Sequence, residues 1–397
     1  MGLVSIFLKA LGETTFMKRI GFLYEQIVSV ENCKLAILNA AKHKIKRKNV
    51  TKILDDIDFY AQDLSERLIC LNFTSPYRTR IIQDGLSGKE RELQIPAFYP
   101  DQCAHHAIIQ VFQPIVLKSS YYWSCANIPE RGIDRAARGV ERATKWDIEY
   151  AKYCVKMDIR KFYPSIPHDK LEERLQEKIK DKKALAIFRT IINSYHSSPG
   201  KGLPIGNYTS PWLAEFYLQP LDHYIKQILG IKYYIRYADD LVLIGDDKRK
   251  LRKALYSIIE YTNSLGLEIK HNYQLFPIQR KYQGVKRLIG RKIDFVGRCF
   301  GIGITTVRKK RALVLMRQSR YIKKKQKYGR GLSYHTAAGF LSRSACFKRT
   351  NSHGMRKKYY DKINTKKLKE IVSNESKRQY LTRSANNRTL STQEGVC

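Results

Sequence analysis

Two adjacent carboxylates, Asp239 and Asp240, lie between two short apolar runs, residues 232–237 and 241–245. Runs so rich in β-branched and aromatic residues, separated by almost nothing, predict a β-hairpin with the acidic pair at its tip. Two like charges there repel each other, and a divalent cation that prefers carboxylate oxygens, such as Mg²⁺, would relieve the repulsion. An Asp-Asp pair is also ordinary turn chemistry, so the hairpin alone does not establish a catalytic site.

A third carboxylate, Asp158, ends another apolar stretch, residues 153–158, whose alternating pattern predicts a strand. If that strand lies beside the hairpin, three carboxylates meet at one edge of a sheet. Such a set can hold two Mg²⁺ ions roughly 3.5–4 Å apart, one to activate a primer 3′-hydroxyl and one to bind a triphosphate. Phosphoryl transfer needs mainly positioning and charge stabilisation, so these residues predict nucleotidyl transfer.

The charge balance indicates a nucleic-acid partner. The 397-residue chain has 74 Lys and Arg against 36 Asp and Glu, a formal net charge of +38. Such an excess repels itself unless a polyanion neutralises it. The basic residues run along the whole chain instead of one amphipathic helix, which argues against a membrane-surface role. A ribosomal or architectural protein would have a similar charge, so charge alone does not distinguish binding from catalysis.

Composition and cysteine spacing narrow the class of protein. Hydrophobic residues make up 43% of the chain, too many for a disordered protein. None of the eight cysteines lies in a C-x-x-C pair, which argues against a zinc ribbon and a secreted disulfide framework. Residues 1–11 lack the order of a signal peptide, and no run is long enough to span a bilayer. We therefore expect a cytoplasmic protein.

Helices must position these strands. Apolar spacings of three and four predict them within residues 13–67, 101–118, 134–142, 212–228 and 248–265. Ser165 is expected to cap the helix that follows it, and Ser210–Pro211 to begin another as cap and proline. Further strands are expected near Ile269 and over 294–299.

These segments, in this order, resemble the palm motifs of reverse transcriptases. The matching residues are Asp158 with Phe162–Tyr163, Gly202–Pro211, the Tyr237–Asp240 box, Leu265–Leu267 and Ile293–Gly297. The segments similar to the family's fingers motifs are Ile95–Pro96, His105–Pro114 and Ser124–Gly132. The resemblance covers roughly residues 90–300, with a weaker thumb-like match to about residue 365, and five motifs in order are far more specific than any one of them.

The resemblance implies an α+β fold of the right-hand polymerase type. Residues 1–150 would form a helical N-terminal extension and fingers, residues 151–300 a palm with a small antiparallel sheet, and residues 301–380 a basic helical thumb. Residues 381–397 are polar and are expected to be a disordered tail. The three aspartates would then lie in the palm, between fingers and thumb.

The activity implied is that of an RNA-directed DNA polymerase, which adds dNMP to a primer 3′ end. Its partners would be an RNA template, a DNA or RNA primer and dNTPs, with room for a small basic accessory protein, and its cofactor two Mg²⁺ ions, which Mn²⁺ can replace. Two alternatives on this fold are template-independent or protein-primed DNA synthesis in antiphage defence, and a non-catalytic, maturase-like RNA-binding protein. The three aspartates argue against the last, because clustered negative charge does not help to bind a polyanion.

The family's site roles transfer to individual residues. The catalytic carboxylates would be Asp158, Asp239 and Asp240, which with Ile159 would also form the metal site. Nucleotide binding would involve Arg131, Tyr163, Ile205 and Gly206, with Tyr163 as the gate against a 2′-hydroxyl. Nucleic acid would contact Ser210, Pro211, Phe295, Gly297, Lys309, Lys310 and Lys324. A core aromatic, a turn glycine and a solvated basic face are the structural alternatives for Tyr163, Gly206 and the lysines.

Two features depart from the family pattern. Ile205 replaces the Gln of retroviral and group II intron enzymes, and an aliphatic residue there is typical of diversity-generating retroelements and of related phage and bacterial groups. The diversity-generating enzymes usually have Gln where this chain has Pro211. The second departure is Tyr273, which stands where the family commonly has a Lys that protonates pyrophosphate; Lys270 and His271 are candidates to replace it.

Overall fold

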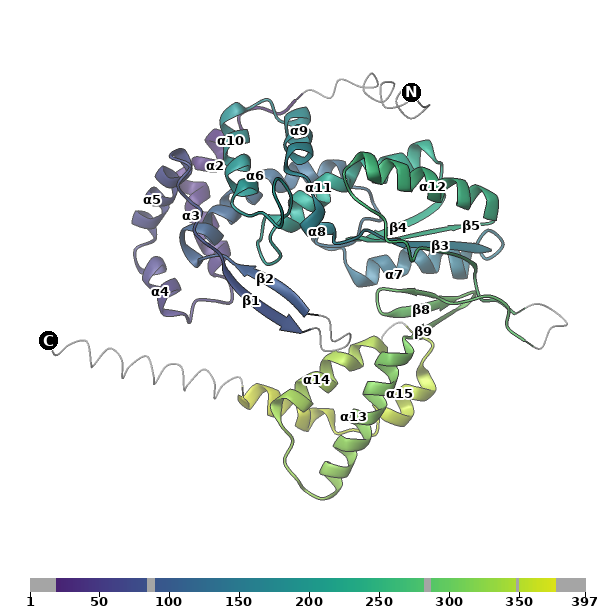
Figure 1. Cartoon of the computed structure of the whole chain (residues 1–397). Helices are drawn as coiled ribbons and strands as arrows, with labels where there is room; N and C mark the ends of the chain where they lie inside the picture. The colour runs from purple at the N-terminus through teal and green to yellow at the C-terminus, as the bar shows by residue number, and fades with distance from the viewer. Residues whose placement is uncertain (1–18, 84–89, 282–286, 348–349, 376–397) are drawn as a thin grey trace.

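The computed structural model describes residues 19–83, 90–281, 287–347 and 350–375. The expected tail, residues 381–397, lies outside these ranges, as do residues 13–18 of the first expected helical region. Figure 1 shows a helical N-terminal lobe, a central sheet covered by helices on both faces, and a helical C-terminal lobe. None of the described helices is long and apolar enough to cross a membrane.

The N-terminal lobe is built from helices that bury one apolar face. They are α2 (Leu23–Val28), α3 (Val30–Ala41), α4 (Lys48–Asp55), α5 (Ile57–Ile69) and α6 (Cys103–Ser119), with the short η1 (Phe98–Gln102) before α6. Between α5 and η1, the antiparallel hairpin of β1 (Arg78–Gln83) and β2 (Glu90–Ile95) leaves the lobe and extends toward the C-terminal lobe (Figure 1).

The central sheet has four antiparallel strands in the order β4-β5-β3-β6. They are β3 (Tyr153–Asp158), β4 (Tyr233–Tyr237), β5 (Asp240–Gly245) and β6 (Gln274–Pro277). Helix α12 (Lys248–Ser264) covers one face and α7 (Ile133–Glu141) the other (Figure 1). The crossing of α7 over β4 requires a glycine, because a Cβ on Gly139 would lie 2.7 Å from Cγ1 of Ile235.

Helices between β3 and β4 close the core around the sheet. They are α8 (Phe162–Ser165), α9 (His168–Lys178), α10 (Lys182–Asn193) and α11 (Ser210–His223). The short η2 (Arg142–Trp146) follows α7, and η3 (Tyr224–Ile228) follows α11.

Two expected helix caps are wrong. Ser165 ends α8, its hydroxyl donates to the Arg160 carbonyl, and Pro167 occupies the cap position of α9. Ser210 lies inside α11 after Thr209, and its hydroxyl donates backward to the Pro204 carbonyl. Both serine hydroxyls donate to a carbonyl oxygen earlier in the chain instead of capping the following helix. A short hydroxyl side chain can always make such a bond.

The C-terminal lobe has its own small core. A three-stranded sheet of β7 (Ile293–Phe295), β8 (Arg298–Gly301) and β9 (Ile304–Val307) leads into α13 (Lys309–Lys327), α14 (Tyr334–Ser344), η4 (Ala345–Phe347) and α15 (His353–Tyr359), and residues 365–375 are again helical. The strand expected over 294–299 is thus two strands with a turn between them, and Ile269 makes an isolated bridge to Ile159 instead of a strand.

The mixed helical and antiparallel architecture confirms the predicted α+β fold. The main core joins the N-terminal helices to the α12 face of the sheet. A second core fills the α7 face, and a third lies within the C-terminal lobe. Both faces of the central sheet are therefore packed against a core, including at the end where β3 stops and β5 begins.

Candidate active site

The structure brings the three aspartates together at one end of the central sheet. Asp158, the last residue of β3, is the cross-strand partner of Asp240, the first residue of β5. The backbone N–H of Ile159 donates to the carbonyl oxygen of Asp239 at 3.1 Å, which ties the hairpin turn to the end of β3. All three aspartates are partly exposed.

Strand alternation places Asp158 and Asp240 on the same face. Cys154 of β3 and Val242 of β5 belong to the core on the α7 side, and the period of two puts both aspartates on that side as well. Lys156 shares this face, and its Nζ donates to the carbonyl oxygen of Asp294 in β7 at 2.7 Å. The carboxylates thus face the side of the sheet on which β7 and the C-terminal lobe lie (Figure 1).

The carboxylates oppose one another's ionisation. Burial, followed by the charge of Asp158, raises the pKa of Asp239, while Lys270 and Arg91 act against the rise. Burial also raises the pKa of Asp240 to about 6; Lys156 opposes this, and Asp158 and Asp239 add to it. Holding Asp239 and Asp240 ionised therefore costs free energy that a bound cation would return.

A lysine already compensates part of this charge. Lys270 forms an ion pair with Asp158, and its backbone N–H donates to the Asp158 carbonyl at 2.8 Å. His271 turns away and lies 3.3 Å from Glu268. Of the two residues that the sequence offered in place of a lysine at position 273, only Lys270 reaches the carboxylates.

The site suits a hard divalent cation by its chemistry. The donors are three carboxylates on adjacent strands, and Ile159 could add only its carbonyl oxygen because its side chain is apolar and fully buried. In the part of the chain that the structure describes, no three His, Cys, Asp or Glu side chains are grouped closely enough to form a finished metal site, and Asp158 is turned toward Lys270. A cation would have to draw the Asp158 carboxylate away from Lys270.

The loop of residues 202–209, called the glycine loop here, lies against both α8 and the β1–β2 hairpin. The N–H of Leu203 donates to the carbonyl of Tyr163, and Ile205 accepts from the N–H of Gln94 in β2 at 2.8 Å. Gly206 has φ +122°, and a Cβ there would lie 2.6 Å from the Gln94 carbonyl oxygen. Glycine is therefore required at position 206 because two backbone segments are in contact there. The sequence alone had suggested only a turn glycine.

Tyr163 lies at the edge of this loop. It is half-buried, and its hydroxyl accepts a hydrogen bond from Asn127 at 3.2 Å. Burial raises the pKa of Tyr163 to about 12, so the ring stays neutral. The ring packs partly against the main core, which is compatible with a gate and with a structural aromatic.

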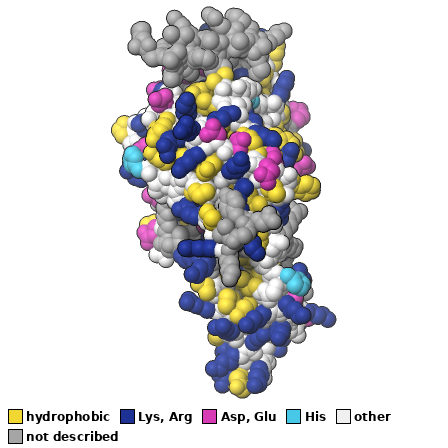
Figure 2. Space-filling model, turned by 90° about the vertical axis from the view of Figure 1, so that its right-hand side faces the viewer, with side chains coloured by type: hydrophobic (Ala, Val, Ile, Leu, Met, Phe, Trp, Pro, Cys, Tyr) yellow, Lys and Arg dark blue, Asp and Glu magenta, His cyan; other side chains and the backbone are white. Residues whose placement is uncertain are grey.

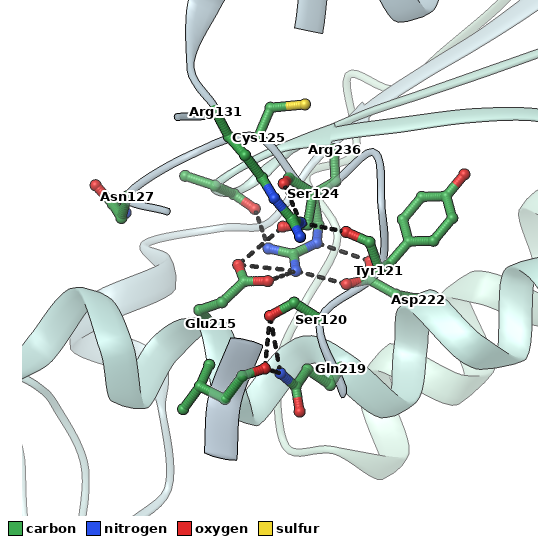
Figure 3. Close-up of polar contacts among 12 residues, drawn as sticks. Ser120, Tyr121, Ser124, Cys125, Asn127, Arg131, Glu215, Gln219, Asp222 and Arg236 are labelled. Atoms are coloured by element: carbon green, nitrogen blue, oxygen red, sulfur yellow. Dashed lines mark hydrogen bonds and ion pairs between the residues drawn. The ribbon is translucent and has the colours of Figure 1, made fainter. Parts of the chain in front are cut away.

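The predicted triphosphate ligand, Arg131, is committed to other partners. Its guanidinium donates to the carbonyl oxygens of Tyr121 at 2.6 Å and Ser124 at 3.0 Å (Figure 3). Arg91, which the sequence reading missed, is exposed on β2 and close enough to lower the pKa of Asp239. No sequence signal distinguished Arg91 from its basic neighbours, since its closeness to Asp239 depends on where the hairpin lies.

A second group that the sequence reading missed is the buried guanidinium of Arg236, four residues before Asp240. It donates to both oxygens of Glu215 at 3.0 Å, to Asp222 at 2.8 and 2.6 Å, and to the carbonyl of Ala238 at 3.2 Å (Figure 3). Burial opposes its charge, but the two carboxylates outweigh burial and raise the pKa of Arg236. The sequence did contain a signal for this group. Arg236 lies inside an apolar strand, at a position that alternation predicts to be buried.

The residues predicted to contact nucleic acid differ in exposure and fall into three groups. Ser210 and Phe295 are buried, and the Ser210 hydroxyl donates to the Pro204 carbonyl oxygen. Pro211 is half-buried in the first turn of α11, and Gly297 lies in the turn between β7 and β8. The exposed members are Lys309, Lys310 and Lys324, all on α13. Figure 2 shows Lys and Arg side chains gathered over the C-terminal lobe, with few acidic ones among them.

Comparison with known proteins identifies the class. Residues 100–286, which include all three aspartates and the glycine loop, match the family model described as reverse transcriptase (RNA-dependent DNA polymerase). The match, over just under half of the chain, identifies residues 100–286 as similar to the reverse transcriptase family.

Individual relatives extend this finding. The chain is similar to the retron Ec73 reverse transcriptase of Escherichia coli, with 31% identity over 32% of this chain and 43% of that protein. It is similar to the group II intron-encoded protein LtrA of Lactococcus lactis, with 26% identity over 44% of this chain and 31% of that protein. It also matches an uncharacterized 91 kDa protein in a cob intron of Schizosaccharomyces pombe, with 30% identity over 44% of this chain and 21% of that protein. Each match spans less than half of the relative's length.

Solved structures give a more distant similarity. The apo telomerase of Candida tropicalis aligns with 79% of this chain and 59% of that chain, with a TM-score of 0.46 and 13% identity.

Proposed function

We propose that the protein is an RNA-directed DNA polymerase that adds dNMP to a primer 3′ end at Asp158, Asp239 and Asp240. The observation that carries this proposal is the pairing of Asp158 with Asp240 across β3 and β5, with Asp239 in the adjoining turn. Burial and neighbouring carboxylate charge raise the pKa of Asp239 and Asp240, which is costly unless these groups serve a cation. The similarity of residues 100–286 to reverse transcriptases supports the same reaction.

Two bound Mg²⁺ ions would supply activation of the 3′-hydroxyl and charge stabilisation of the triphosphate. Asp158, Asp239 and Asp240 would hold them. The Nζ of Lys270, which lies beside Asp158, would give a proton to an oxygen of the leaving group. Arg91 is placed to neutralise a phosphate that approaches Asp239.

The decisive experiment is incorporation of dTTP on poly(rA)/oligo(dT) with Mg²⁺, comparing wild type with Asp239→Asn. The matched control is Asp246→Asn, which changes an exposed aspartate just beyond the other end of β5. Incorporation that only Asp239→Asn abolishes supports the proposal. Equal activity in all three proteins contradicts it. If wild type extends the primer equally well without poly(rA), the template-independent alternative replaces it.

Ile205 is the residue that indicates which kind of retroelement the enzyme serves. An aliphatic residue before Gly206 favours an enzyme of the diversity-generating kind, although Pro211 departs from that group. We therefore propose elevated misincorporation opposite template adenine, which sequencing of cDNA copied from a mixed RNA template measures. Ile205→Gln should lower the error rate at adenine more than at the other bases. An unchanged error spectrum argues for a retron-like or intron-like enzyme.

A further inference from the structure

A pocket of about 580 Å³ lies at the base of the β1–β2 hairpin, against α4. Its volume is that of an ordinary small-ligand site. The wall is formed by α4 and the turn before it, by Arg78 at the start of β1, and by residues 95–99 and Gln102 at the end of β2 and in η1. The base is the end of the hairpin away from the C-terminal lobe (Figure 1).

The lining combines cations with aromatic rings. Arg47, Lys52 and Arg78 contribute exposed positive charges, and no carboxylate lines this pocket. Among the described residues, none of these three cations takes part in an ion pair. The half-buried rings of Tyr60 and Tyr99 meet edge to face, with centroids 5.1 Å apart. Rings for a base beside cations for phosphates are the pattern of a single-strand site.

The basic surface continues beyond this pocket. A neighbouring hollow of about 460 Å³ shares Lys52 and is lined also by Lys46, Lys48, Thr51 and one carboxylate, Asp55. Cations spread along a surface follow a chain of phosphates, whereas a site for one free nucleotide would converge them on a single phosphate group.

The pocket also adjoins the glycine loop. Ile95 and Pro96 of its lining directly follow Gln94, whose N–H donates to the Ile205 carbonyl at 2.8 Å. A nucleic-acid strand that passes the glycine loop at Ile205 would therefore reach the pocket within a short distance. The C-terminal lobe, with its basic α13, lies at the other end of the hairpin (Figure 1).

We propose that this pocket binds an unpaired base of the template strand ahead of the active site, with Arg47, Lys52 and Arg78 on the flanking phosphates. The inference rests on the proposed function, because only a template-directed polymerase has single-stranded template entering on one side of the catalytic carboxylates and duplex leaving on the other. Stacking on Tyr60 or Tyr99 would tolerate any base, as a template requires.

The test measures binding of fluorescein-labelled RNA–DNA primer–template by anisotropy, without nucleotide, so that no catalysis is needed. The substrates share one duplex and have template 5′ overhangs of increasing length, from blunt upward. The variant Arg47→Gln/Lys52→Gln/Arg78→Gln is compared with Lys248→Gln/Arg249→Gln/Arg252→Gln. The control removes three exposed charges from α12 and leaves the same net charge.

For wild type and control we expect affinity to rise with the overhang by about tenfold, as stacking of one base and a few phosphate contacts predicts. The pocket variant should bind the blunt duplex as wild type does and lose that gain. For this variant, the slope of log affinity against log salt concentration should also be shallower by up to about 2, because three phosphate contacts are lost. Equal losses on blunt and overhanging substrates, or no loss, overturn the proposal.

A photocrosslink gives a positive readout of position. 5-Iodouridine at successive overhang positions should crosslink to peptides containing Tyr60 or Tyr99, and crosslinks confined to other regions overturn the proposal. Competition by AMP at millimolar concentration, with no effect of overhang length, would assign the pocket to a free nucleotide and also overturn it. Binding is read separately from extension, so an inactive wild type that shows the overhang effect counts against the proposed catalysis alone.

Discussion

The Arg236 guanidinium donates to the carbonyl oxygen of Ala238, the residue that precedes the acidic pair, at 3.2 Å. Ala238 has a positive φ of 54°, which a non-glycine residue adopts only at a cost. Glu215 and Asp222 of α11 hold the guanidinium in place from the other side. The hydrogen bonds of one buried arginine thus connect the turn that carries Asp239 to α11.

This relationship predicts that Arg236 positions the catalytic turn. Arg236→Lys keeps the charge but cannot span both carboxylates and the Ala238 carbonyl, so we expect kcat for dTTP incorporation to fall by about 10- to 100-fold, with KM nearly unchanged. Arg236→Met should also lose stability, by about 3–5 kcal/mol, because it leaves two buried carboxylates unpaired.

A neutralised triple variant separates the two effects. Arg236→Met/Glu215→Gln/Asp222→Asn removes the unpaired charges and should recover most of the stability lost by Arg236→Met. Its kcat should stay low, because the Ala238 carbonyl still lacks its donor. Thermal unfolding and steady-state kinetics measure the two quantities, and wild-type kcat in the triple variant would show that Arg236 is only structural.

Lys270 should affect turnover more than substrate binding. Lys270→Gln removes the cation paired with Asp158, and if its Nζ protonates the leaving group we expect a fall in kcat of about 10²-fold or more. His271→Gln, one residue away and facing Glu268, serves as the control and should retain activity. Single-turnover rates across a range of pH measure the effect, and equal rates for the two variants would exclude Lys270 as the acid.

Gly206 and Gly200 form a matched pair for the glycine loop. Both have positive φ, but an added Cβ would meet the Gln94 carbonyl only at Gly206, and nothing lies within 4 Å of a Cβ at Gly200. Gly200→Ala should cost about 1 kcal/mol of stability from backbone strain alone. Gly206→Ala must also push the β1–β2 hairpin away from the loop, so its activity should fall further, by about tenfold or more. Similar activity in the two variants would show that the contact with Gln94 does not matter.

His105 makes the stability of the protein sensitive to acid. It is fully buried, both ring nitrogens lack a hydrogen-bond partner in the described structure, and burial lowers its pKa to about 3. An unfolded histidine titrates near 6.5, so the folded state is favoured above that pH and loses this contribution as the pH falls toward 3.

We therefore expect His105→Phe to lose less stability than wild type between pH 7 and pH 5, by up to about 2 kcal/mol. Urea unfolding at the two pH values measures the difference. The exposed His335→Gln should behave as wild type. A wild-type pH dependence in His105→Phe would show that His105 is not the group responsible.

Much of this site is encoded locally. Alternation of apolar residues was sufficient to predict β3, β4 and β5, and with them the strand end at Asp158 and the hairpin tip at Asp239 and Asp240, because a strand's faces are set by its own period of two. Helix spans followed from spacings of three and four in the same way. The helix caps were less predictable, since the hydroxyls of Ser165 and Ser210 could accept from helix N–H groups ahead of them or donate to a carbonyl behind them.

What only the tertiary structure decided is the choice of partners between distant segments. Arg131 pairs with carbonyls in its own loop while Arg91 approaches Asp239, and Lys270 reaches Asp158 while His271 does not. Charged side chains are long and similar, so sequence spacing does not decide which of them meets a given carboxylate. Packing of the hairpin, α11 and the sheet sets those distances, and with them the electrostatics of the site.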